Sequence, residues 1–379
     1  MKIVYCDHAA TTYVKKEVLN SMIPYFTEQY GNPSSTYTLG RNNKRAITKA
    51  RQQVAKAINC LPKEIYFTSG GSESDNLAIK GFAYANKNKG NHIITSKIEH
   101  PAVLKTCETL HNQDFEITYL NVDQNGFVKI VELINAIKDN TILISIMTAN
   151  NEIGTIQKIK KIGEIAKSKN IAFHTDAVQA IGNIKIDVQD MNIDMLSMSA
   201  HKFYGPKGLG ALYVKSGIQF DRILDGGHQE NGKRSGTENV PGIVGLGKAI
   251  EIANKNMDNY NKKLLRLRDI FIRELENKIG KENIRINGDL INRLPGNVNI
   301  SFKNKDSERI LIELDKRNIC ASGGSACSSS SLSPSHVLCA LGMEKMWING
   351  ATRFTFGEEN TIEDIQYVAN SLNQIINRI

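Results

Sequence analysis

From Glu64 onward the sequence alternates between short apolar runs and stretches in which apolar residues recur at helical spacing. The apolar runs have the length of buried strands, and most of the intervening stretches are long enough for a crossover helix. This alternation predicts an α/β domain built on a mostly parallel sheet that is covered by helices. The seven expected strands are Ile65–Thr68, His92–Thr95, Phe115–Leu120, Ile142–Met147, Ile171–His174, Met195–Met198 and Ala211–Val214.

The chain is long enough for two domains, because its 379 residues exceed the roughly 150 of an average domain. An amphipathic stretch from about Ile243 to Lys278 predicts a long helix that joins them. We assign residues 13–255 to the large α/β domain. Residues 1–12 and 256–379 are expected to form a smaller α+β domain, with strands at Ile284–Ile286, Val298–Phe302 and Thr352–Phe356.

The net charge of +9 does not indicate a nucleic-acid partner, because the basic residues are scattered along the chain. Lys158–Lys161 and the pair Lys262-Lys263 interleave with apolar positions, as on solvated helix faces. There is no apolar run of about 18 residues and no apolar N-terminal segment, so we expect a cytoplasmic protein without a membrane partner. The six cysteines form no C-x-x-C pair, which in a reducing compartment favours free thiols over disulfides or structural zinc.

One lysine and one acid stand out by their positions. Lys202 lies in Ser199-Ala-His-Lys202, between an expected strand and a glycine-rich stretch, and Asp176 follows the preceding strand. Both are expected at the carboxyl edge of the sheet, where α/β proteins bind ligands. Pyridoxal phosphate (PLP) requires a lysine for covalent attachment, an acid opposite its ring nitrogen and several donors for its phosphate. The simpler interpretation makes Lys202 a solvated loop residue and Asp176 a turn former.

Further polar motifs follow the other expected strands. In Thr68–Asp75 the glycines precede a helix whose first amides favour an anion such as phosphate. The alternative is capping of that helix by Ser72, with Asp75 in a variant of the capping box. Glu99-His100 offers either an acid–base group that works near neutral pH or an ordinary surface histidine. Donors suited to a phenolic oxygen or to phosphate are offered by Asn150-Asn151, Asp176–Gln179 and Arg234–Thr237.

Together these motifs resemble those of the NifS/IscS-type cysteine desulfurases, which belong to the aminotransferase-like PLP enzymes of fold type I. The resemblance extends in order from residue 7 to about residue 357, and it is specific because eight motifs agree jointly. The motifs are Asp7-His-Ala-Ala-Thr-Thr12, Gly31-Asn-Pro-Ser-Ser35, Thr68-Ser-Gly-Gly-Ser-Glu73, Glu99-His100, Asn150-Asn-Glu-Ile-Gly154, His174-Thr-Asp-Ala-Val-Gln179, Ser199-Ala-His-Lys202 and Arg234-Ser-Gly-Thr-Glu-Asn239.

The resemblance implies a role for each matched residue around the PLP ring. Lys202 would bind the cofactor covalently and move the Cα proton of the substrate. Asp176 would keep the ring nitrogen protonated, so that the ring withdraws electrons. His100 would stack on the ring and act in catalysis, while Gln179 and Asn151 would orient the ring oxygen.

The resemblance also implies a phosphate site and a substrate site. The phosphate would be bound by Gly71, Ser72, Ser199, His201 and, from the second subunit of a homodimer, Thr237. The substrate carboxylate would be held by Asn32 and Arg353 with help from Asn151. An arginine fits this task because its guanidinium grips a carboxylate with two parallel hydrogen bonds.

The stretch that favours a desulfurase over other PLP enzymes is 321–334 in the smaller domain, which is almost entirely Gly, Ser and Ala around Cys327. An aminotransferase has no need of a thiol there. A desulfurase needs one that can reach the substrate and later present its sulfur elsewhere. The alternative makes Cys327 a small residue in a flexible linker. The other five cysteines lie in or beside expected strands and helices, as packing residues do.

The resemblance thus implies a homodimeric enzyme that converts L-cysteine to L-alanine and leaves sulfur on Cys327 as a persulfide. The serine-rich loop resembles that of the group which delivers sulfur to an iron–sulfur scaffold, where Cys327 could transiently ligate a cluster; no resident metal is expected. The alternatives are another PLP enzyme, such as a selenocysteine lyase or an aminotransferase, and a non-catalytic binding protein. Departures from the family pattern, which bear on loop packing and partner choice, occur at Tyr37, Asn231 and Glu358.

Overall fold

The computed structural model describes residues 2–323 and 334–379. The strands of its largest sheet are β2 (Ile65–Thr68), β3 (His92–Ser96), β4 (Glu116–Leu120), β5 (Thr141–Ser145), β6 (Ala172–Asp176), β7 (Met195–Ser199) and β8 (Gly210–Val214). They lie in the order β2-β8-β7-β6-β5-β3-β4. The strands from β7 to β4 in this order run parallel, whereas β8 is antiparallel to both of its neighbours. The predicted α/β fold with a mostly parallel seven-stranded sheet is confirmed.

Helices cover both faces of this sheet. They include α3 (Thr38–Ile58), α4 (Gly71–Ala85), α5 (Pro101–His111), α6 (Ile130–Ala136) and α7 (Ile159–Ser168). Neighbouring residues of a strand point to opposite faces, and the core divides accordingly. Ile144 and Phe173 join an apolar cluster with residues of α3 and α7, whereas Leu143 and Ala172 join one with residues of α4 and α5. Because both faces are buried, the strands are nearly continuous apolar runs.

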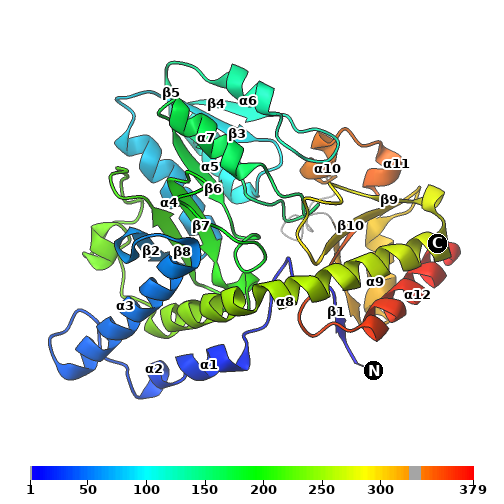
Figure 1. Cartoon of the computed structure of the whole chain (residues 1–379), viewed down its shortest axis with the longest axis horizontal. Coiled ribbons are helices and arrows are strands. Elements are labelled where there is room, and N and C mark those ends of the chain that lie inside the picture. Colours follow the sequence, from blue (N-terminus) through cyan, green and yellow to red (C-terminus); the bar gives the residue numbers. More distant parts are fainter. Residues whose placement is uncertain (1, 324–333) are drawn as a thin grey trace.

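The helix α8 (Val240–Ile279) runs from the large sheet to a second group of elements, which holds both chain termini (Figure 1). That group contains an antiparallel sheet in the order β12 (Ser322–Gly323), β13 (Ala351–Thr355), β10 (Asn297–Phe302) and β9 (Ile284–Ile286). A parallel pair is formed by β1 (Val4–Tyr5) and β11 (Ile319–Cys320). The apolar core of this second group of elements includes Phe271, Phe302 and Phe354. The helices here are α9 (Ser307–Asp315), α10 (His336–Ala340), α11 (Lys345–Ile348) and α12 (Ile362–Arg378).

Two local expectations differ from the structure. The pattern predicts one helix over Val14–Tyr30, but α1 (Lys16–Met22) ends before Pro24, which begins α2 (Pro24–Thr27). Proline lacks the N–H that would continue the first helix and suits the first turn of the next. The expectation that Ser72 caps α4 is wrong, because Gly70 is the N-cap, with a φ of 157° that side chains disfavour.

The separate core around α8, α12 and the small sheet is consistent with a second domain, and the proposed bounds of 13–255 and of 1–12 with 256–379 stay a prediction. Within the described residues, no helix combines the length and the apolar character needed to cross a bilayer. The large sheet remains the frame of the molecule, because its carboxyl edge presents the residues discussed next.

Candidate active site

A cavity of about 260 Å³ lies at the carboxyl ends of β6 and β7. Parallel sheets place their ligands at this edge, beyond the last residues of the strands. The cavity brings together ten residues that the sequence analysis assigned: Gly71, Ser72, His100, Asn151, Asp176, Gln179, Ser199, His201, Lys202 and Arg353. Its other lining residues are Ala9, Ala10, Asp75 and Val178.

A larger cavity, of about 550 Å³, lies at the opposite edge of the sheet, beside the first residues of β5 and β6. Among its four lysines, Lys167 donates to Asn192 at 2.9 Å, and Lys215 pairs with Asp194 at 3.2 Å. Of the assigned residues that the structure describes, none lines this cavity. The smaller cavity, with its converging polar groups, is therefore the candidate active site.

Lys202 is held by the N-terminal segment of the chain. It ends the short 3-10 turn Ala200–Lys202 that follows β7. Its Nζ donates to the carbonyl oxygens of Ala9 at 2.6 Å and Ala10 at 2.7 Å. Thr12 fastens the same segment to the turn, because its amide and its hydroxyl both donate to the His201 oxygen at 2.9 Å. The position of the lysine thus depends on a segment 193 residues away in sequence.

Asp176 is a buried carboxyl group at the end of β6. Its Oδ1 accepts a hydrogen bond of 2.8 Å from the Val178 amide. Burial raises the pKa of Asp176, although His100, the Val178 amide and Lys202 act in the opposite direction. A cation placed against this carboxylate favours its ionised form. The site therefore suits a protonated ring nitrogen.

A second buried carboxyl group, Asp75 of α4, also lines the cavity. Its Oδ1 lies 3.7 Å from Nε2 of His174, whose two ring nitrogens lie 2.9 Å from the Ser145 hydroxyl and 3.0 Å from the Ser197 hydroxyl. Burial lowers the pKa of His174 to about 3, so this ring is neutral. Burial, and next the charge of Asp176, raise the pKa of Asp75 well above its usual range. Asp75 keeps its proton, which leaves the negative charge to Asp176.

His100 has a defined tautomer in this structure. It is the N-cap of α5, and its Nδ1 accepts a hydrogen bond of 3.1 Å from the Ala102 amide. An amide can only donate, so Nδ1 carries no proton and the neutral ring has its N–H at Nε2. Burial lowers the pKa of His100; Asp176 opposes this, while Lys202 and His336 reinforce it. His100 therefore offers the cavity a hydrogen-bond donor at Nε2.

The neighbouring Glu99 supports this corner of the site from within the core. Its carboxyl group is fully buried and accepts hydrogen bonds from the Ser96 hydroxyl at 2.6 Å and the Met147 amide at 3.0 Å. Burial raises the pKa of Glu99 to about 8, despite these hydrogen bonds. The main-chain oxygen of Glu99 lies 3.0 Å from Nε2 of His336, the first residue of α10.

We expect the buried proton of Glu99 to make stability fall as pH rises. The folded chain holds this proton up to about pH 8, whereas the unfolded chain releases it near the ordinary value of 4.5. Between pH 6 and pH 8 the free energy of unfolding should decrease by about 2 kcal/mol from this group alone. Urea unfolding of the wild type and E99Q at both pH values tests this, because glutamine keeps the acceptor oxygen without the titration. An equal pH dependence in the two proteins contradicts the assignment.

Arg353 of β13 is buried and lines the same cavity. Its Nη2 lies 2.8 Å from Oδ1 of Asp7, and its Nη1 donates to the Asn151 main-chain oxygen at 3.1 Å. The second oxygen of Asp7 accepts from the Ser322 hydroxyl at 2.6 Å. A guanidinium has five N–H donors, so these bonds leave some of them for an incoming carboxylate.

Comparison with known proteins shows the family of the chain. Residues 4–368 match the family Aminotransferase class-V. The chain is 56% identical over 377 residues to the cysteine desulfurase IscS of Clostridium botulinum, which covers 99% of this chain and 94% of that protein. It is 55% identical over 378 residues to the cysteine desulfurase IscS of Methanosarcina thermophila, covering 100% of this chain and 93% of the relative.

The chain belongs to the class-V aminotransferase family. Within it, the chain groups with the IscS-type cysteine desulfurases. Among solved structures, a NifS-like protein superposes with a TM-score of 0.94 at 37% identity, covering all of both chains. The X-ray structure of a NifS-like protein from Rickettsia africae gives a TM-score of 0.89 at 31% identity, covering 99% of this chain and 100% of that one. These two superpositions, together with the family match, show that the chain has the architecture of the fold-type I enzymes.

The class-V family uses PLP, and the cavity fits that cofactor. The amino end of α4 points its first amides at the cavity, where Ser72, Ser199 and His201 also lie, as an anion site requires. A Cβ on Gly71 would lie 2.7 Å from Cγ2 of Val178, so only glycine leaves the backbone this close. The lysine needed for attachment and the acid needed for a ring nitrogen lie in the same cavity.

Three assigned residues are not among those lining the cavity. Asn32 is exposed, and its Oδ1 accepts from the Ser34 amide at 2.9 Å. Thr237 is also exposed, as expected of a residue proposed to act in the other subunit. Nearby, Arg234 pairs with Glu73 at 2.8 Å. Cys327 lies outside the described residues, and its role stays a prediction.

Sequence reasoning missed several groups that the fold brings to the site. Asp75 was interpreted as a cap, yet it lies one turn into α4 and is buried against His174. The carbonyl oxygens of Ala9 and Ala10 carry no side-chain signal at all. Asp7 belongs to a matched motif, but nothing in the sequence indicates its pairing with Arg353, 346 residues away.

Proposed function

We propose that this chain is a PLP-dependent cysteine desulfurase that converts L-cysteine to L-alanine and transfers the sulfur to its own Cys327. The observation that carries the proposal is that Lys202, Asp176 and Arg353 line one cavity. The first two residues suit the cofactor, and the third suits the carboxylate of an amino acid. The names of the relatives, cysteine desulfurase IscS, support the same reaction.

Different side chains of the cavity have different roles in the first half-reaction. When bound, PLP withdraws electrons from the carbon that bears the substrate amine, which makes the Cα proton removable. The carboxylate of Asp176 stabilises the positive charge of the protonated ring nitrogen. Asp75 is protonated and neutral, so it adds no second negative charge beside Asp176. Lys202 accepts the Cα proton at Nζ and later returns a proton to the product. Nε2 of His100 donates a hydrogen bond over the reacting atoms.

Sulfur transfer is a thiol reaction that needs no external oxidant. The thiolate of Cys327 attacks the substrate sulfur, so that an S–S bond forms while the C–S bond breaks. The electron pair of the broken bond remains on the substrate carbon, which takes up a proton and leaves as alanine. One thiol and one molecule of cysteine thus become one persulfide and one molecule of alanine, with atoms and electrons balanced.

Arg353 should determine affinity for the substrate carboxylate. We expect R353K to raise KM for L-cysteine about 10-fold to 100-fold, because an ammonium cannot make the two parallel hydrogen bonds of a guanidinium. The value of kcat should change less. Steady-state kinetics measure both values, and R222K on the protein surface serves as control. An unchanged KM in R353K contradicts the assigned role.

The wider setting of the enzyme is also proposed. We propose a homodimer that works in the cytoplasm. The dimer is supported by exposed apolar side chains on the segment from α1 to α3, namely Leu19, Ile23, Phe26, Tyr30 and Tyr37. Closure of that face by a second copy would also explain why Asn32 and Thr237 lie outside the cavity of one chain. The sulfur acceptor is an iron–sulfur scaffold protein, as the name IscS of the relatives suggests.

Product analysis tests the function. Purified protein loaded with PLP is incubated with L-cysteine and a thiol reductant, and alanine and sulfide are measured. The proposal predicts equal amounts of both over many turnovers. Activity confined to selenocysteine, or turnover that depends on a 2-oxo acid, identifies a different PLP enzyme and contradicts the proposal.

A further inference from the structure

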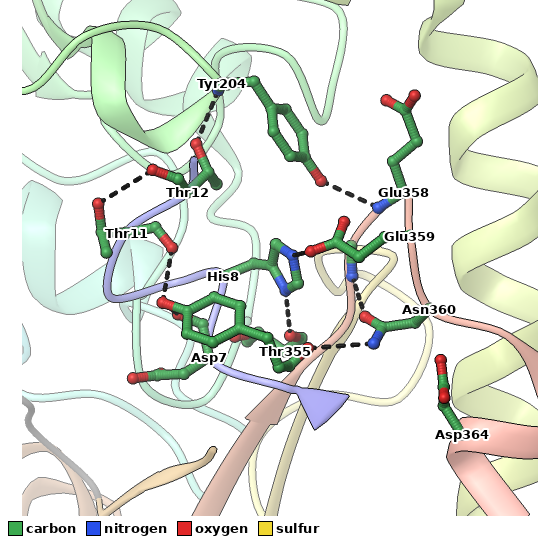
Figure 2. Close-up of polar contacts among 12 residues, drawn as sticks. Asp7, His8, Thr11, Thr12, Tyr204, Thr355, Glu358, Glu359, Asn360 and Asp364 are labelled. Atoms are coloured by element: carbon green, nitrogen blue, oxygen red, sulfur yellow. Dashed lines mark hydrogen bonds and ion pairs between the residues drawn. The ribbon is translucent and has the colours of Figure 1, made fainter. Parts of the chain in front are cut away.

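His8 belongs to the N-terminal segment that holds Lys202 and directly precedes Ala9. Its Nδ1 is 2.8 Å from the main-chain oxygen of Thr355 at the end of β13, and its Nε2 is 2.8 Å from Oε1 of Glu359 (Figure 2). The side chain of His8 is 7% exposed, so water does not replace these partners. The two ring nitrogens thus lie beside oxygen atoms of the last residue of β13 and of the segment that follows it.

The chemistry of the two partners assigns a charge to the ring. A carbonyl oxygen can only accept, so Nδ1 must carry a proton. A carboxylate also only accepts, so Nε2 must carry a second one. The side chain of Glu359 is 39% exposed, so its carboxyl group stays in contact with water, which favours the charged form. Glu359 is therefore ionised, and His8 is an imidazolium.

The groups packed around His8 suit a cation. The ring of Tyr5 meets it edge-to-face at 4.9 Å between centroids, and Tyr204 lies at 6.2 Å. Asp7 adjoins it in sequence. A Cβ on Gly357 would overlap the imidazole, so glycine provides the space that the ring occupies. The other titratable groups on the packed elements are Tyr13, Tyr260, Lys263 and the ion pair of Lys15 with Glu358.

The residues next to His8 in sequence contact the two side chains to which the reaction assigns central roles, Lys202 and Arg353. Before it, Asp7 pairs with Arg353 and accepts from Ser322. After it, the carbonyl oxygens of Ala9 and Ala10 receive Nζ of Lys202. Thr355 fixes the same segment by accepting from the His8 amide at 3.3 Å and, through its hydroxyl, from the Ala9 amide at 2.8 Å.

We propose that His8 is a positively charged positioning residue, whose imidazolium bridges Thr355 and Glu359 and fixes segment 7–10 so that Lys202 and Arg353 are correctly placed. A neutral ring has one proton for two acceptors, so one of the two bonds would be lost. The segment would then hold its carbonyl oxygens and Asp7 less firmly. The positioning role rests on the functions proposed above for Lys202 and Arg353, whereas the charge of His8 stands independently of them.

The charge is tested by ¹⁵N NMR of the histidine side chains in the PLP-loaded protein at pH 7.5. We expect one of the eight histidines to show both ring nitrogens protonated, and H8Q to remove that signal and thereby assign it. In E359Q at the same pH, which keeps an acceptor oxygen without the charge, the same signal should be weaker than in the wild type. One unprotonated nitrogen on His8 in the wild type overturns the proposal, whatever the fate of the variants.

The positioning role is tested with H8Q against H111Q, an exposed histidine outside the site. We expect H8Q to lower kcat/KM roughly 10-fold to 100-fold, the size of effect that small misplacements of reacting groups produce. Because Lys202 shifts with the segment, the visible absorbance of bound PLP should change its pH profile in H8Q and not in H111Q. A charged His8 combined with unaltered kinetics and absorbance in H8Q contradicts the positioning role. Absence of alanine formation by the wild type would instead remove the proposed function.

Discussion

Replacing Lys202 with alanine lowers the rate of alanine formation by at least about 10⁴-fold, the range observed when a central catalytic side chain is removed. The main-chain oxygens of Ala9 and Ala10, which accept hydrogen bonds from Nζ of Lys202, cannot take up a proton at neutral pH. The variant should also lose the visible absorbance of covalently attached PLP. Stopped assays for alanine and an absorbance spectrum measure the two effects.

A lysine in the same loop provides the matched control for K202A. Lys207 is exposed, and its Nζ lies 3.4 Å from the Thr12 oxygen. K207A should therefore keep the absorbance and most of the activity. If K202A retains the absorbance of attached PLP, another amine holds the cofactor and the role assigned to Lys202 is wrong.

Replacing Cys327 with serine abolishes sulfur transfer while leaving the cofactor in place. A hydroxyl group is a poor nucleophile toward sulfur, so no bond to the substrate sulfur forms. Alanine formation should fall by about 10³-fold or more, as for the loss of other nucleophiles. The PLP absorbance should remain, because the groups that surround the cavity are unchanged. Kinetics and the spectrum of C327S measure both.

The control for this variant is C339S. Cys339 is a free and exposed cysteine in α10, close in sequence to the same stretch. We expect C339S to retain wild-type turnover. Full desulfurase activity in C327S, or a loss of activity confined to C339S, would show that the nucleophile is a thiol other than that of Cys327.

The large sheet could be predicted from sequence because most of its strands are short buried segments that contain several apolar residues. β2 has the expected bounds, and the bounds of β7 and β8 differ by a single residue. β11 and β12 could not be foreseen, since two residues are too few to show alternation. Their pairings join segments far apart in the chain and depend on the tertiary fold.

The residues of the site also differ in whether a local sequence pattern can predict their positions. Asp176 and Ser199 end parallel strands, so the rule for α/β sheets places them together once the strands are recognised. The contacts of Asp7 and of the Ala9 and Ala10 oxygens arise when the N-terminal segment docks between the two cores. No local pattern encodes such docking, and for main-chain oxygens the side chains give no indication.

The most direct test of the central claim is a search for the persulfide on Cys327. The PLP-loaded protein is mixed with L-cysteine without reductant, its thiols are alkylated, and the peptides are weighed by mass spectrometry. The account predicts one extra sulfur atom on the peptide that contains Cys327, together with alanine in solution. Alanine without that sulfur, or extra sulfur on the Cys339 peptide alone, would contradict it.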